Sequence, residues 1–125
     1  MHSTRSLCLF VVLIAYVAAA EKGKCAKEHN IDQPDFEELK KNPIDPPEKM
    51  LCFFKCEYER VGALNADKTV DADKLVEELV KWRRLRETAK NEIKECVQKL
   101  TVPVNSCPDV KPYHLCVHNV LKNEV

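Results

Sequence analysis

Cysteine spacing is the feature that most constrains what this chain can fold into. Seven of its 125 residues are cysteine, and six of these lie between residues 25 and 116. An even number of cysteines in an exported chain indicates a framework of disulfide bonds. Such bonds matter here because a chain of this size buries only a modest core. The pattern of the six is Cys25-x26-Cys52-x3-Cys56-x39-Cys96-x10-Cys107-x8-Cys116.

The seventh cysteine, Cys8, lies in an N-terminal segment with the layout of a secretory signal peptide. A single positive charge precedes an apolar run over residues 7–17, and three alanines follow as a small-residue cleavage site. A transmembrane anchor is the alternative, but a span needs about 20 apolar residues. We therefore predict a signal peptide over residues 1–20, cleavage before Glu21, and a secreted, extracellular mature chain, 21–125.

The mature chain is close to electrically neutral. The full sequence has 20 Lys+Arg and 20 Asp+Glu, and the first twenty residues contain Arg5 but no acid. Their removal leaves one acidic residue in excess. Nucleic-acid binding requires a basic field, so nucleic acid is excluded as a partner. The length of segment 21–125, which shows no repeat or linker, indicates one domain.

Helical patterns dominate the mature chain, which we assign to the all-α class. Only two glycines occur in the sequence, and strand-like alternation of apolar and polar residues is scarce. Apolar residues instead recur at helical spacing between proline and capping signals. The predicted helices cover residues of about 22–29, 34–41, 46–60, 72–80, 84–100 and 109–122.

Local signals mark several helix ends. Asp45, followed by two prolines and a glutamate, predicts the N-cap of the helix over 46–60. Gly62 lies just past the end of that helix, where a left-handed cap is expected. Asp71 predicts the N-cap of the next helix. No glycine or proline separates that helix from its successor, and we expect a bend within residues 81–86.

Two cysteines, Cys52 and Cys56, are four residues apart on a predicted helix and share one face. Cysteines one helical turn apart seldom satisfy disulfide geometry, so each is expected to reach a different partner. This helix would then be the hub of the fold. Six cysteines allow 15 pairings, and the sequence pattern alone does not choose among them.

The full spacing resembles that of the six-cysteine insect odorant-binding (pheromone-binding) proteins. The likeness covers essentially the whole mature chain and includes Lys55-Cys56 in an aromatic-rich helix, Gly62-Ala63-Leu64, and a helix start at Asp71–Leu75. It implies a compact bundle of about five to six helices with an internal apolar cavity. It also implies three disulfides: Cys25–Cys56, Cys52–Cys107 and Cys96–Cys116.

By this resemblance the protein is a secreted carrier that binds small hydrophobic molecules, such as odorants or pheromones, between its helices. A small apolar ligand is the implied partner, and no cofactor is implied. A membrane receptor and a second copy of the chain are further partners that this role leaves open. The inner faces of the predicted helices supply the candidate ligand-binding residues: Met50, Phe53, Phe54, Leu75, Leu79, Trp82, Val97, Leu100 and Leu115.

Ordinary core packing is the competing interpretation for each of these positions. Phe54 and Trp82 are favoured as ligand contacts, because large aromatic side chains offer the most contact area. Cys25 is the fifth residue of the predicted mature chain, which predicts a pocket without part of its N-terminal wall. Only nine residues follow Cys116, so we expect pH-dependent release through helix loosening rather than through a long tail.

Other chemistry finds little support in the sequence. His114 and His118 could share a helix face, but no third metal ligand accompanies them. The sequence has no G-x-S-x-G nucleophile motif, and an enzyme is not predicted. Basic residues within 81–86 indicate a solvated helix face, with an acidic partner or membrane surface as the alternative. A secreted signalling or inhibitory protein that acts through its surface is the alternative function.

Overall fold

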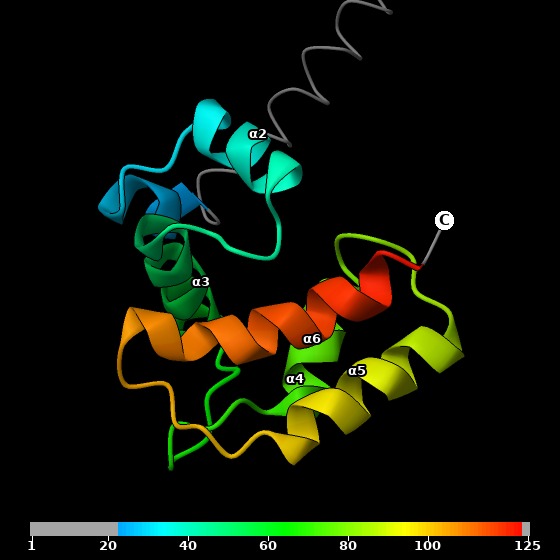
Figure 1. Cartoon of the computed structure of the whole chain (residues 1–125). Helices are drawn as coiled ribbons and strands as arrows, with labels where there is room; N and C mark the ends of the chain where they lie inside the picture. Colours follow the sequence, from blue (N-terminus) through cyan, green and yellow to red (C-terminus); the bar gives the residue numbers. More distant parts are fainter. Residues whose placement is uncertain (1–22, 124–125) are drawn as a thin grey trace, which may run out of the picture.

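The computed structural model describes residues 23–123 of the chain, whose regular secondary structure is almost entirely helical (Figure 1). A helical segment over residues 23–28 comes first. It is followed by α2 (Gln33–Lys41), α3 (Glu48–Arg60), α4 (Ala72–Leu79), α5 (Glu87–Lys99), a 3-10 helix η1 (Cys107–Val110) and α6 (Lys111–Leu121). Within the described residues the only strand-like feature is one antiparallel bridge, Leu64 to Val70. The all-α prediction is confirmed, while the predicted signal peptide lies outside the described residues.

The predicted end of α3 and start of α4 are confirmed. Gly62 has a φ of 73°, in the left-handed region. Its N–H donates to the Glu59 carbonyl at 3.2 Å and the Ala63 N–H donates to the Tyr58 carbonyl at 2.8 Å, which is the Schellman arrangement. At α4, the Asp71 carboxylate accepts from the Lys74 backbone N–H at 3.1 Å. Local chemistry therefore sets both ends of this connection.

The predicted N-cap Asp45 is wrong. Helix α3 begins at Glu48 with Pro47 as its N-cap residue. A residue that precedes proline is disfavoured in the helical region, so Pro46 cannot start the helix before Pro47. Asp45 instead accepts from the Lys111 ammonium at 2.8 Å, an interaction that holds the α2–α3 connection against α6.

Helices α4 and α5 are separate, so the expected bend is a full break over residues 80–86. Near the C-terminus, the single helix predicted over 109–122 is instead η1 followed by α6. The Ser106 hydroxyl and backbone N–H interact with the Asp109 carboxylate at 3.0 and 2.9 Å, a capping box that starts η1 two residues earlier than predicted.

The main core lies where α4, α5 and α6 meet, with α6 running across the other helices (Figure 1). Ile93 and Tyr113 are completely buried. The Tyr113 hydroxyl donates to the Val102 carbonyl at 2.6 Å, so its polar end is satisfied inside the core. None of the described helices is both long and apolar enough to cross a membrane.

Three disulfides join the helices, and all three implied pairings are confirmed. Cys25–Cys56 joins the first helical segment to α3, Cys52–Cys107 joins α3 to η1, and Cys96–Cys116 joins α5 to α6. The bonded residues are separated by 31, 55 and 20 positions. In the chain-entropy view each bond stabilises the fold by about 3–4 kcal/mol. Cys52 and Cys56 do serve different partners, so α3 is the hub.

Candidate functional site

The structure divides the nine predicted ligand-binding residues into three groups. Met50, Leu75 and Val97 are buried core residues, with exposed fractions of 0%, 4% and 1%. Trp82 lies at the other extreme. The remaining five are half-buried: Phe53, Phe54, Leu79, Leu100 and Leu115. Of these, Phe54, Leu79 and Leu100 pack against the main core.

The expectation that Trp82 lies on an inner helix face is wrong. Its side chain is 61% exposed, in the turn between α4 and α5. Helix α4 ends at Leu79, so the helical periodicity that placed Trp82 inward no longer applies three residues later. Leu85, in the same turn, is the residue that reaches the core, where it is 7% exposed.

Half-buried aromatic rings form a continuous row across α2, α3 and α6. Phe36 meets Phe53 edge-on, with ring centroids 5.7 Å apart. Phe53 lies 5.8 Å from Phe54, which in turn stacks on His114 at 5.0 Å and 15°. We call Phe36, Phe53, Phe54 and His114 the aromatic row. Each ring contacts another and retains some exposed surface, so the row offers apolar area to a ligand.

His114 fixes one end of the aromatic row. Its Nε2 lies 2.6 Å from the Pro43 carbonyl oxygen, which ties α6 to the connection between α2 and α3. Desolvation lowers the pKa of His114, and the nearby His118 lowers the pKa further, while the Pro43 carbonyl opposes the shift. The ring is therefore favoured in its neutral form, which suits an apolar surrounding.

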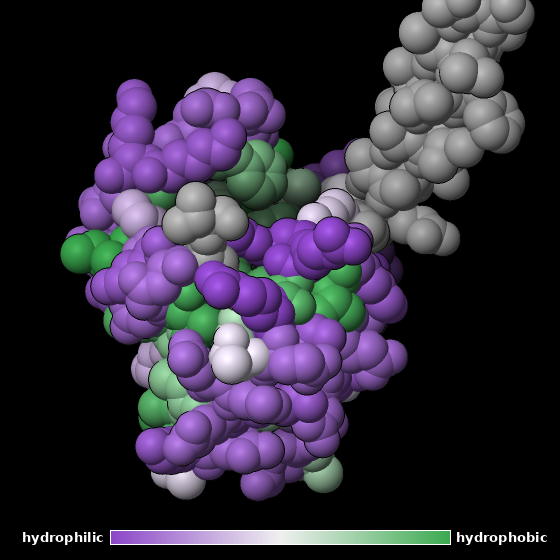
Figure 2. Space-filling model, turned by 90° about the vertical axis from the view of Figure 1, so that its right-hand side faces the viewer, coloured by the Kyte–Doolittle hydropathy of each residue, from purple (hydrophilic) through white to green (hydrophobic). Residues whose placement is uncertain are grey.

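The surface beside the aromatic row is also partly apolar. Ile44, next to Pro43, is 58% exposed. Figure 2 shows hydrophobic surface between hydrophilic side chains in the upper half of the molecule, where α2 lies. Helix α2 itself buries no residue completely. It therefore covers its neighbours without being embedded in the core.

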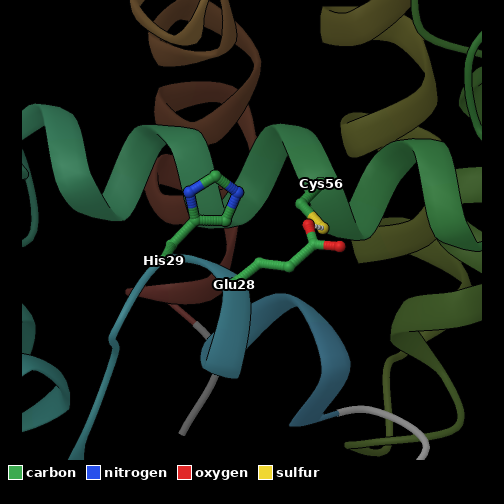
Figure 3. Close-up of side chains that lie close together, drawn as sticks. All are labelled: Glu28, His29 and Cys56. Atoms are coloured by element: carbon green, nitrogen blue, oxygen red, sulfur yellow. Dashed lines mark hydrogen bonds between the residues drawn. The ribbon is translucent and has the colours of Figure 1, made fainter.

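A separate pocket of about 380 Å³ lies between the first helical segment and α3. Charged side chains and disulfides line this pocket, in place of the predicted apolar residues. Glu28, His29 and Cys56 lie together at its wall (Figure 3). Their potential ligand atoms lie within 4.8 Å of one another, which is the geometry of a candidate metal site.

Disulfide bonding removes the third ligand from this cluster. Cys56 is bonded to Cys25 and has no thiolate to offer a metal ion. Its Sγ lies 3.5 Å from a Glu28 carboxylate oxygen, and because a bridged sulfur carries no proton this is a close contact rather than a hydrogen bond. Glu28 and His29 alone do not make a structural metal site, which takes four ligands.

The fold and the disulfide pairing define a class of six-cysteine helical proteins whose hub helix carries two of the bridges. The family model of the PBP/GOBP family matches residues 18–120, and the chain belongs to this family of insect odorant-binding proteins. It is a family of carriers of small hydrophobic ligands rather than of enzymes. No curated protein and no solved structure matches the chain significantly.

Sequence reasoning missed two members of the aromatic row. Phe36 is the one aromatic residue of α2, and its spacing gave no sign that it meets Phe53 on α3. His114 was weighed only as a metal ligand. The bridged Cys116 gave no signal for it, because residues two apart on a helix point to different faces.

Proposed function

We propose that this protein carries small hydrophobic molecules, such as odorants or pheromones, and that they bind against the aromatic row. The continuous contact of Phe36, Phe53, Phe54 and His114 across three helices carries this proposal. Burial of apolar ligand surface gains about 0.8 kcal/mol per CH₂, so a ten-carbon ligand gains roughly 8 kcal/mol before ordering costs. Ordering costs reduce this gain, so a dissociation constant on the order of micromolar is the tightest that it supports.

The site has few polar groups that would require a polar ligand. Membership of a carrier family supports the same ligand class. The disulfides on α3 and α6 hold two sides of the row in place, which lowers the ordering cost of binding. The ligand class is therefore set by size and apolar area more than by hydrogen-bonding groups.

The test is displacement of the fluorescent apolar probe N-phenyl-1-naphthylamine from the mature chain by aliphatic and aromatic alcohols. Phe36→Ala and Phe53→Ala should each lose about 50 Å² of apolar contact, which weakens binding roughly tenfold. Trp82→Ala is the control, since it removes an aromatic ring that lies outside the row. Equal loss in all three variants would contradict the proposed site.

Failure of every apolar probe to bind would favour the second function, a secreted signalling or inhibitory protein that acts through its surface. Such a protein needs stable helices and disulfides but no ligand site. A membrane receptor or a second copy of the chain would then be its partner. Probe binding by the unmodified mature chain separates the two functions.

We also propose that residues 1–20 direct secretion and are removed before Glu21. Three disulfides in a chain of this size support an oxidising, extracellular destination. N-terminal sequencing of the protein released by expressing insect cells tests this, and a first residue of Glu21 is expected. Retention of the intact chain in the cell would contradict it.

A further inference from the structure

The turn between α4 and α5, residues 80–86, combines exposed apolar side chains with positive charge. Val80 is 38% exposed and Trp82 is 61% exposed, and both belong to the few large apolar side chains that the described surface displays. An exposed tryptophan side chain leaves a large apolar area in water. This turn lies apart from α2 (Figure 1, yellow-green) and plays no part in the aromatic row.

The same turn is basic along its whole length. Residues 80–86 read Val-Lys-Trp-Arg-Arg-Leu-Arg, with four cations and no acid. The Lys81 ammonium pairs with Glu78 at 2.8 Å, whereas Arg83 and Arg84 are exposed. An open surface pocket of about 480 Å³ brings Trp82, Arg83 and Arg84 together with Lys90 of α5. The cations therefore surround the apolar surface.

The turn is also fixed on the fold. Leu85 is 7% exposed and belongs to the main core, so it anchors the segment between the two helices. On the α4 side, the backbone N–H groups of Trp82 and Arg83 both donate to the Leu79 carbonyl, at 3.0 and 3.1 Å. A surface held in this way pays little ordering cost when it docks.

We propose that residues 80–86 dock the protein on a membrane surface rich in anionic phospholipid. Tryptophan favours the level of the lipid headgroups, where its ring is apolar and its N–H remains hydrated. Cations beside it are attracted to anionic headgroups, and stable interfacial binding generally needs both contributions. The mature chain is nearly neutral overall, so the attraction is local to this turn. A carrier docked here would hold its aromatic row near a membrane without inserting a helix.

Vesicle binding by the mature chain tests the proposal. Vesicles of phosphatidylcholine containing phosphatidylserine should bind the protein and shift the emission of Trp82, the only tryptophan in the sequence, to shorter wavelength. Vesicles of phosphatidylcholine alone should bind much less. Added salt should weaken the binding, because exposed charges are screened beyond about 8 Å at physiological ionic strength.

Two double variants test whether vesicle binding depends on this turn or only on the number of positive charges. Each cation near an anionic surface contributes roughly fivefold to partitioning, so Arg83→Gln/Arg84→Gln should weaken vesicle binding roughly 25-fold. The control Lys40→Gln/Lys41→Gln makes the same charge change on α2 and should bind almost as the unmodified chain does. Trp82→Ala, followed by co-sedimentation, should also weaken binding.

Three results would overturn the proposal: no emission shift with phosphatidylserine vesicles, equal binding to both vesicle types, or equal losses in the two double variants. An acidic protein partner or a simply solvated turn would then account for the basic residues. Probe displacement by the same variants keeps this result distinct from the ligand site, because neither double variant touches the aromatic row.

Discussion

Helices α4, α5 and α6 are held in place by different interactions from those that hold α2. Helices α4, α5 and α6 share a continuous buried core, and the Cys96–Cys116 bond joins two of them. Helix α2 has no fully buried residue and no cysteine, and it belongs to none of the closely packed helix pairs. Its contacts include the Phe36–Phe53 ring pair and the Lys49–Asp35 ion pair at 3.1 Å. We call α4, α5 and α6 the frame and α2 the cover. The frame is joined by a continuous core, whereas the cover is held by few contacts.

The largest expected effect comes from the bond that joins the hub helix to η1. Cys52→Ala/Cys107→Ala opens a loop with a sequence separation of 55. In the chain-entropy model this costs about 4 kcal/mol in free energy of unfolding. Urea denaturation measures it, with Cys96→Ala/Cys116→Ala as the comparison. The shorter loop of 20 in the second variant should cost about 1 kcal/mol less on the entropic term.

A core truncation should separate the frame from the cover. Ile93→Ala, at a completely buried position of α5, should lower the free energy of unfolding by about 2–5 kcal/mol. Phe36→Ala removes a larger side chain but should cost less, because α2 is not embedded in the core. The same denaturation experiment measures both. A larger loss for Phe36→Ala would show that α2 is part of the frame.

Acid should destabilise the packing of α6 against α3, because the His114 ring is desolvated where it stacks on Phe54. Burial lowers the pKa of His114 below its ordinary value of 6.5, so the unfolded chain takes up this proton more readily than the folded chain. His114 therefore contributes stability that is complete above about pH 6.5 and is lost as the pH falls toward its folded-state pKa. The midpoint temperature of thermal unfolding and the affinity for the probe should both fall from pH 7 to pH 5.

The variant His114→Gln should flatten both pH profiles, because it removes the titrating ring and keeps a side chain that can reach the Pro43 carbonyl. His29→Gln is the matched control, because His29 lies outside the aromatic row and is not among the groups that shift the pKa of His114. If the unmodified chain binds the probe with the same affinity at pH 7 and pH 5, release by helix loosening is contradicted.

The smallest expected effect on stability concerns the ion pair between Lys49 of α3 and Asp35 of α2. Lys49→Ala removes the partner of Asp35, a partly exposed carboxylate whose pKa is lowered by a hydrogen bond from the Asp32 backbone N–H and by Lys49. Exposed ion pairs contribute little, so global stability should hardly change. Amide hydrogen exchange should nevertheless become faster within Gln33–Lys41 and stay the same in α5. Equal acceleration in both helices would remove the distinction between frame and cover.

Local chemistry made part of this fold predictable. The Gly62 and Asp71 signals act within a few residues of the chain, and the structure confirms both. The disulfide pairing followed from family resemblance, because spacing alone leaves 15 combinations. Asp45 failed as a cap because two successive prolines delay the helix, a backbone restriction that outweighs its capping side chain.

The candidate site was less predictable than the fold. Helical periodicity shows which face of a helix is apolar, but not which distant helix that face meets. The aromatic row joins Phe36 to Phe53 and Phe54 to His114, pairs that lie far apart in sequence. Trp82 was misplaced because the periodic pattern was extended past Leu79, where the helix ends.

Nuclear magnetic resonance of the mature chain, titrated with a long-chain alcohol, tests the proposed ligand site most directly. The aromatic proton signals of Phe36, Phe53, Phe54 and His114 are expected to shift together with one dissociation constant. The indole signal of Trp82 should not move with them, since that ring lies in the turn between α4 and α5. Shifts confined to Trp82, or the absence of any shift in the aromatic row at saturating ligand, would contradict the proposed carrier site.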